Sequence, residues 1–278
     1  MFYNCQKFTS MDLTGWDLSN CTAMNLMFTG CSNLTEIKGI EDWDVSKCTS
    51  FDSLFLNCSS LTSLDLSSWD VSQCTNMGNM FNGCGNLIEL KLMKSELNNI
   101  TNVGSMFKKC SSLTSIDLSS LILNKATTTQ YMFMDCTSLT DIRFNDLSFS
   151  NISNCADMFS NCMALTNIDL SSIHITKNIK MNHMFNNCPK LQSIKMFNCD
   201  GNVETIHNAF SGCKVLKTLD LSNLTIAPNT NIGSMFWGCK ELEMVDLSNI
   251  RNIGDSGGIF TDCPKLTTLG LLYSTGEL

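Results

Sequence analysis

The sequence predicts an α/β solenoid, a leucine-rich-repeat type of stack in which about eleven strand–turn–helix rungs form parallel sheets. A Phe-x-x-Cys signature returns eleven times along the 278 residues, with successive cysteines 24 to 27 positions apart. Apolar residues stand three and six positions after each signature cysteine, and in most rungs an L-x-x-L-x-L pattern or its apolar equivalent is complete. Fixed periods of about 20 to 50 residues are typical of repeat proteins in which each rung contacts only its neighbours.

The first segment of each rung is predicted to be a short strand. After Cys58, leucines stand at Leu61, Leu64 and Leu66. This alternation places one face of a strand in the core, and the signature Phe and Cys are expected to be buried beside it. The core residues predicted in this way are Phe28, Cys31, Phe55, Cys58, Phe81, Cys84, Phe107, Cys110, Phe133, Cys136, Phe159, Cys162, Phe185, Cys188, Phe210, Cys213, Phe236 and Cys239.

The segment before each signature cysteine is expected to be a short amphipathic helix. The positions i, i+3, i+4 and i+7 of one helical face are apolar. Thr75 is suited to cap the start of this helix, and Gly83 to close it in the left-handed conformation. The apolar positions in this rung are Met77, Met80, Phe81 and Cys84.

An outward-facing position of each predicted strand alternates in charge from rung to rung. In a parallel stack this order places acids beside bases and keeps like charges apart. We interpret the ladder as structural, with two rungs as the true repeat, because each exposed pair contributes only about 0–1 kcal/mol. The ladder consists of Asp12, Lys38, Asp65, Lys91, Asp117, Arg143, Asp169 and Lys195.

Two sets of residues are candidates for binding a partner. The charge alternation fails at Asp220 and Asp246, which form either a solvated acidic face or a site for a cation or a basic group. Trp16, Trp43 and Trp69 occur in Trp-Asp pairs in the first rungs. Their column is mostly Leu or Ile elsewhere, so core packing is the simpler interpretation. The alternative is an aromatic strip for a partner or a sugar.

The sequence predicts no catalytic, metal or cofactor site. Sixteen cysteines occur, but none forms a C-x-x-C pair with a following His pair, as zinc sites require. We interpret them as free, buried thiols, which fits a reducing compartment. His174, His183 and His207 stand at non-equivalent repeat positions, and no carboxylate is placed with them in a way that suggests general-base chemistry.

Residues 1–278 are predicted to form one solenoid domain without evident capping modules, because the period is unbroken. The net charge of −8 and a pI near 4.8 argue against nucleic acid or an anionic membrane surface as partner. No apolar run is long enough to span a bilayer. The N-terminus also lacks the basic and apolar segments of a signal peptide.

Two stretches carry a resemblance to a known family. Met80–Cys84 supplies an M-F-x-x-C corner, and Leu61–Asp70 supplies L-T-x-L-D-L-S-x-W-D. Together they resemble BspA-like leucine-rich-repeat surface proteins, particularly the branch with 26-residue M-F-x-x-C repeats seen in mycoplasma, gut bacteria, some protists and their viruses. The resemblance implies a surface or extracellular protein that binds host or matrix molecules without catalysis.

Two functional hypotheses follow. The first is a non-enzymatic recognition or adhesion module that binds a protein or glycan partner at a cell or particle surface. The second is a structural subunit of a larger assembly, such as a virion or a fibre, whose open terminal rungs dock on neighbours. The first hypothesis predicts a monomer in solution, and the second predicts an ordered oligomer.

Overall fold

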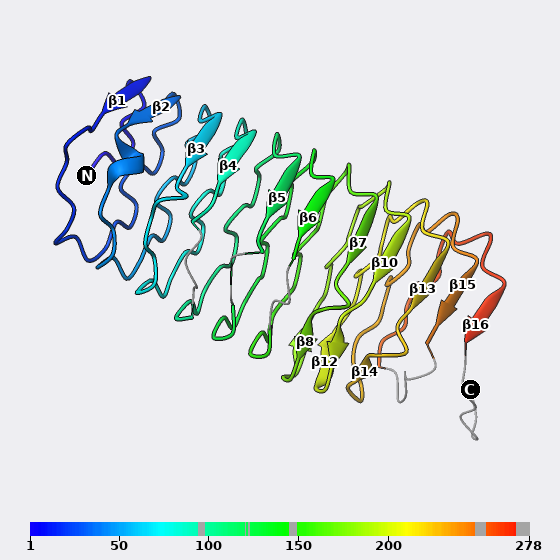
Figure 1. The fold of residues 1–278 in the computed structure, drawn as a ribbon. Coiled ribbons are helices and arrows are strands. Elements are labelled where there is room, and N and C mark those ends of the chain that lie inside the picture. The colour runs from blue at the N-terminus through cyan, green and yellow to red at the C-terminus, as the bar shows by residue number, and fades with distance from the viewer. Residues whose placement is uncertain (94–97, 120, 122, 145–148, 248–253, 271–278) are drawn as a thin grey trace.

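A computed structural model of the chain describes residues 1–93, 98–119, 121, 123–144, 149–247 and 254–270. The rungs stack in a single row from the N-terminus to the C-terminus, and their main strands share one face (Figure 1), so the predicted parallel solenoid is confirmed. The strands of this face are β1 (Ser10–Asp12), β2 (Glu36–Lys38), β3 (Ser63–Asp65), β4 (Glu89–Lys91), β5 (Ser115–Asp117), β6 (Asp141–Arg143), β7 (Asn167–Asp169), β10 (Ser193–Lys195), β13 (Thr218–Asp220), β15 (Met244–Asp246) and β16 (Thr268–Gly270).

Hydrogen bonds join these strands mostly in parallel pairs. β1 pairs with β2, β3 with β4, β5 with β6 and β7 with β10, whereas β13, β15 and β16 form one sheet. Each two-stranded pair joins a strand that ends in Asp to one that ends in Lys or Arg, as Asp65 faces Lys91. The backbone therefore has a period of two rungs, which is also the period of the charge alternation.

The second extended segment of each rung lies on a different side of the stack, where Figure 1 places β8, β12 and β14. A separate column, directly before the corner turns, forms isolated parallel bridges in the earlier rungs, such as that between Asn76 and Asn102, and continues to Lys180 of β9. One 3₁₀ turn, η1 (Ile40–Asp42), interrupts the second rung. The regular strands outside the main face are β8 (His174–Ile175), β9 (Ile179–Lys180), β11 (Asn198–Cys199), β12 (Asn202–Thr205) and β14 (Thr225–Ile226).

The predicted helices are wrong, because the segment before each signature cysteine is a run of tight turns. Before Cys84, every second amide donates to the carbonyl three residues earlier, over 3.0 to 3.3 Å; these amides belong to Met80, Asn82 and Cys84. The amides between them donate instead to carbonyls of the next rung, over 2.8 to 3.0 Å; they belong to Met77, Asn79, Phe81 and Gly83.

Left-handed residues explain why these segments are not helical. Asn79 and Gly83 have φ angles of 54° and 79°, each at the position where a type II turn requires a positive φ. A right-handed helix does not tolerate a positive φ at every fourth residue. Thr75, the predicted helix cap, instead donates with its amide and its hydroxyl to the carbonyl of Thr49, over 2.8 and 3.1 Å.

The signature phenylalanines form one continuous stack through the molecule. From Phe2 to Phe260, successive ring centroids lie 5.1 to 5.8 Å apart, with interplanar angles of 4° to 12°. The nine inner rings and their nine cysteines, from Phe28 to Cys239, are fully buried. Burial of aromatic area is the largest contribution that a side chain makes to a core, so this column is the main apolar contact between rungs.

The signature cysteines make hydrogen bonds as well as apolar contacts. The Cys84 Sγ donates to the Phe55 carbonyl of the preceding rung over 3.2 Å, and the Cys58 amide donates to the same carbonyl over 3.0 Å. The equivalent thiol contacts in other rungs span 2.9 to 3.3 Å. The thiol therefore satisfies the second lone pair of a buried carbonyl.

Replacing a central ring of the stack should strongly destabilise the fold. We expect Phe133→Ala to lower the free energy of unfolding by about 3–5 kcal/mol, because it removes a fully buried ring and leaves a cavity between two others. Urea denaturation followed by circular dichroism measures this change. Lys190→Ala, at an exposed position, should change stability by less than about 0.5 kcal/mol. Equal stability of the two variants would contradict a central role for the stack.

Thiol titration should separate two classes of cysteine. We expect nearly all sixteen cysteines to react with a thiol reagent after denaturation without reductant. In the native protein at neutral pH, the reactive residues should be the four half-buried ones, Cys5, Cys21, Cys199 and Cys263. Burial raises the pKa of Cys84 to about 12, which disfavours the reactive thiolate. Denatured protein in which most cysteines do not react would show that the thiols are paired.

Candidate functional site

The main strand face presents a column of exposed charges whose closest ion pairs lie within the two-stranded units. The Lys91 Nζ lies 2.9 Å from the Asp65 Oδ2, and the Lys195 Nζ lies 2.7 Å from the Asp169 Oδ2. Hydrogen bonds from Ser67 and from Lys91 lower the pKa of Asp65 to about 2. These acidic and basic side chains therefore interact mainly with one another.

The remaining ladder residues make looser contacts. Asp12 lies opposite Lys38 in the register of β1 and β2. Asp117 lies opposite Arg143, but the Arg143 Nε approaches Asp141 of its own strand, at 3.8 Å. The ladder is therefore not a uniform row in which every interior acid contacts a base on both sides. Hydrogen bonds join the strands that carry the ladder in separate pairs, and each pair places one acid opposite one base.

Asp220 and Asp246, the candidate acidic residues, are brought together. They face each other in the register of the parallel strands β13 and β15, and Gly270 of β16 follows on the other side of Asp246. Hydrogen bonds from Ser222 lower the pKa of Asp220, so this carboxylate is ionised at neutral pH. The two candidate residues therefore lie on neighbouring strands of one sheet.

The candidate tryptophans are not an aromatic strip on the surface. Trp43 and Trp69 are 4% and 1% exposed, and their rings stack on each other at 6.2 Å. Trp16 is half-buried and lies 5.8 Å from the Phe2 ring. The Trp69 indole donates to the Ile40 carbonyl over 2.9 Å. The binding role considered for Trp43 and Trp69 is therefore wrong, because their column faces the core.

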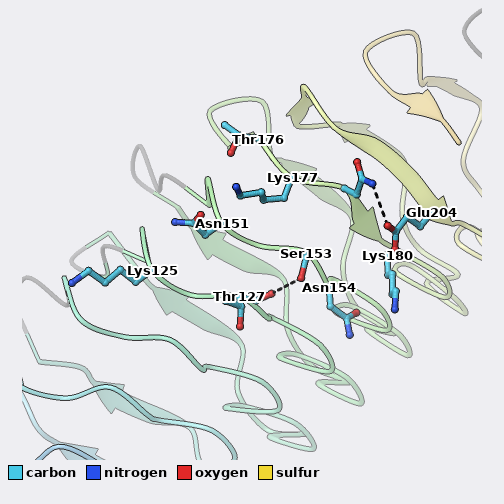
Figure 2. Close-up of a pocket in the computed structure, with 10 residues that line it drawn as sticks. Lys125, Thr127, Asn151, Ser153, Asn154, Thr176, Lys177, Lys180 and Glu204 are labelled. Atoms are coloured by element: carbon cyan, nitrogen blue, oxygen red, sulfur yellow. Dashed lines mark hydrogen bonds between the residues drawn. The ribbon is translucent and has the colours of Figure 1, made fainter.

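A polar groove of about 930 Å³ opens away from the main strands, across four successive rungs (Figure 2). None of its lining residues is apolar, and three lysines and one glutamate supply its charge. Sequence patterns gave no signal for this groove, because its residues come from rungs that are separated along the chain. The lining residues are Lys125, Thr127, Asn151, Ser153, Asn154, Thr176, Lys177, Asn178, Lys180 and Glu204.

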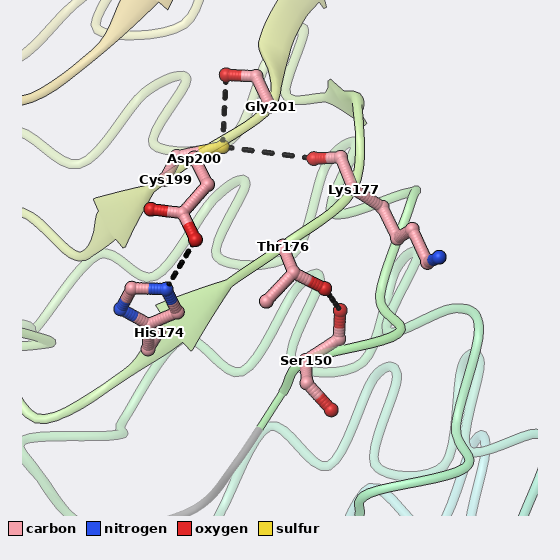
Figure 3. Close-up of polar contacts among 7 residues, drawn as sticks. All are labelled: Ser150, His174, Thr176, Lys177, Cys199, Asp200 and Gly201. Carbon is pink, nitrogen blue, oxygen red and sulfur yellow. Dashed lines mark hydrogen bonds and ion pairs between the residues drawn. The ribbon is translucent and has the colours of Figure 1, made fainter.

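A His–Asp pair lies near this groove (Figure 3). The His174 Nε2 lies 2.9 Å from the Asp200 Oδ2, between the paired strands β8 and β11. The adjacent Cys199 Sγ contacts the Lys177 and Gly201 carbonyls at 3.6 and 3.4 Å. Burial raises the pKa of Cys199, so this thiol is not an activated nucleophile.

The other two histidines also meet in the fold, although they occupy non-equivalent repeat positions. The His183 and His207 rings lie 4.9 Å apart and nearly perpendicular. Burial raises the pKa of the neighbouring Asp157, an effect that His183 opposes. Stacking thus places Asp200 beside His174 and Asp157 near His183, carboxylates from different rungs that the sequence pattern does not indicate.

The described residues give no sign of a metal centre or a membrane span. No three His, Cys, Asp or Glu side chains in this part of the chain are grouped as metal ligands. Across the same residues, no helix is both long and apolar enough to cross a bilayer.

Lowered carboxylate pKa values should make the ladder sensitive to acid. The ordinary aspartate pKa is about 3.9, and that of Asp65 is about 2 in the folded protein. Its stabilising effect should be complete above about pH 4 and lost as the pH falls toward 2. We expect Asp65→Asn to cost up to about 1 kcal/mol at pH 7 and less at pH 2. Urea denaturation at both pH values, with Glu36→Gln as the exposed control, measures the difference; a cost that does not shrink at pH 2 would contradict the assignment.

The family described as "Mycoplasma protein of unknown function, DUF285" matches the chain at residues 1–116, 64–173, 87–196 and 153–269. These overlapping matches confirm the family relation predicted from the M-F-x-x-C repeats. No curated protein matches the chain.

Solved structures with similar folds include leucine-rich-repeat proteins from several bacteria. A leucine-rich cell surface protein of Faecalibacterium prausnitzii is 18% identical, with a TM-score of 0.45 over 99% of this chain and 76% of that one. A leucine-rich repeat protein of Bacteroides ovatus is 18% identical, with a TM-score of 0.37 over 96% and 79%. An internalin of Listeria monocytogenes is 13% identical, with a TM-score of 0.31 over 97% and 88%.

Proposed function

The chain belongs to the DUF285 family of mycoplasma proteins, and we propose that it is a non-enzymatic module that binds a macromolecular partner at a cell or particle surface. The observation that carries the proposal is the strand face. From β1 to β13, the first and last residue of each main strand is exposed. Solenoids of this kind use such extended surfaces for binding.

The rigidity of this surface supports the proposal. Each rung is fixed to its neighbours by amide hydrogen bonds, a ring stack and thiol contacts, so the exposed side chains are held at regular intervals. A pre-organised surface loses less conformational entropy on binding than a mobile one. The main strands carry few exposed apolar side chains, with Met244 and Leu269 near the C-terminal end as examples.

Exposed acids on the strand face also support the proposal. Ion pairs occupy the ladder residues Asp65 with Lys91 and Asp169 with Lys195, whereas Glu36 and Glu89, the first residues of β2 and β4, are exposed. We infer that these glutamates contact a basic part of a protein partner. Electrostatic complementarity of this kind affects the association rate and specificity more than affinity.

A binding screen tests the proposed function. The purified chain is immobilised and exposed to panels of host surface proteins, matrix proteins and glycans. For any partner found, we expect Glu36→Lys with Glu89→Lys, on β2 and β4, to weaken binding at least tenfold. Lys108→Glu, on the turns away from the strands, serves as the control. A partner whose affinity changes only in the control would place the interface off the strand face.

The oligomeric state distinguishes this role from that of a structural subunit. Size-exclusion chromatography with light scattering should show a monomer if the chain is a recognition or adhesion module. A stable, ordered oligomer joined through the terminal rungs would instead favour a subunit of a larger assembly.

A further inference from the structure

We propose that the polar groove described above binds an acidic oligosaccharide, one whose sugar rings carry carboxylate or sulfate groups. This site is separate from the strand face, because its residues lie on the side of the stack that carries β9 and β12. Figure 2 shows Lys125, Lys177 and Lys180 placed around the rim, with Thr127 and Ser153 between them. The site and the strand-face interface can therefore be tested, and can fail, independently.

The charge of the groove favours an anionic ligand. The groove holds three lysines and one glutamate, a formal charge of +2, in a chain whose net charge is −8. Within the described part of the chain, no ion pair involves Lys177 or Lys180. The Lys125 Nζ donates to the neutral Asn99 side chain over 2.9 Å. These ammonium groups are available to an anionic ligand.

The hydroxyl groups of the groove donate their hydrogen bonds to the backbone. The Thr176 hydroxyl donates to the Ser150 carbonyl over 2.7 Å, and the Ser153 hydroxyl donates to the Thr127 carbonyl over 3.3 Å. Thr127 likewise donates to Thr101, over 3.3 Å. Each hydroxyl proton is already donated within the protein, so these oxygens can only accept a hydrogen bond from a ligand. The ligand must therefore bring donors as well as negative charge.

Two asparagine side chains of the groove are occupied by hydrogen bonds within the protein. The Asn178 side chain donates to the Glu204 Oε1 over 3.3 Å and accepts the Asn202 amide over 3.0 Å. Asn154 similarly donates to Gln130 and accepts the Ala156 amide, at 3.1 and 3.0 Å. These amides hold the shape of the groove and leave the lysines and hydroxyl oxygens as its ligand-facing groups.

An acidic saccharide combines the two required properties. Its carboxylates or sulfates accept from lysine, and its ring hydroxyls donate to threonine and serine. The dianion of a phosphate monoester has no donor on its phosphate group, so that group would leave the hydroxyl oxygens unmatched. Peptide recognition generally relies on apolar side-chain pockets or on added strands, and the groove has no apolar lining residue. The groove therefore favours a saccharide over an acidic peptide.

Titration calorimetry with defined probes tests the proposal on the full chain. The probes are a uronic-acid oligosaccharide, a sulfated oligosaccharide, a neutral oligosaccharide and a polyglutamate peptide of similar length. We expect binding of one or both acidic saccharides at low salt, weakening as ionic strength rises, and none of the neutral one. Equal or tighter binding of polyglutamate, or no binding of either acidic saccharide, would overturn the proposal.

Matched variants place the binding in the groove. Lys177→Gln with Lys180→Gln should weaken acidic-saccharide binding at least tenfold, whereas Lys190→Gln with Lys214→Gln removes the same charge from exposed positions elsewhere and should have little effect. Glu204→Gln should strengthen binding, because it removes the one negative charge and keeps an oxygen for Asn178. Circular dichroism checks that each variant is folded. Equal losses in the two lysine pairs would indicate non-specific attraction and overturn the assignment.

Discussion

The structure depends on how the backbone amides are divided at each corner. Every second amide closes a turn within its own rung, and the amides between them bond to the next rung, as Phe81 bonds to Met106 over 2.9 Å. This division needs left-handed residues at fixed positions, which glycine and asparagine supply at low cost. Leu26 and Tyr131 also adopt the left-handed conformation, with φ angles of 59° and 60°. Such residues cost about 1–2 kcal/mol each, and the surrounding hydrogen bonds hold them in place.

The corner geometry in turn determines which positions can vary. A ring and a thiol recur in every rung, because a smaller residue in one rung alone would leave a cavity in a stack whose ring centroids lie less than 6 Å apart. The outward strand positions have no such restriction. Their alternating acids and bases follow the pairing of strands such as β3 and β4, so the charge pattern is coupled to the two-rung period of the backbone.

The repeat, the parallel strands and the buried columns could be predicted from the sequence, because each depends on the identity of residues within one rung. The corners were mispredicted for a physical reason. Apolar residues at Met77, Met80, Phe81 and Cys84 have helical spacing, and a pair of four-residue turns produces the same spacing. Gly78 and Asn79 disfavour a helix, but only the inter-rung hydrogen bonds decide between the two. The groove could not be predicted, since Lys125 and Glu204 meet only through stacking.

The groove lies where the chain departs from its own repeat. Up to Asn154 the column directly before the corner turns makes only isolated bridges, whereas its next member, Lys180, belongs to the strand β9. β8 and β9 flank the segment Thr176–Asn178, in which Lys177 lies at the rim of the groove. A regular rung has its surface constrained by its neighbours on both sides. An irregular rung can expose side chains that have no equivalent in the rungs beside it. In a solenoid whose core residues are fixed by stacking, such departures are the positions where a specific binding site can form without changing the fold.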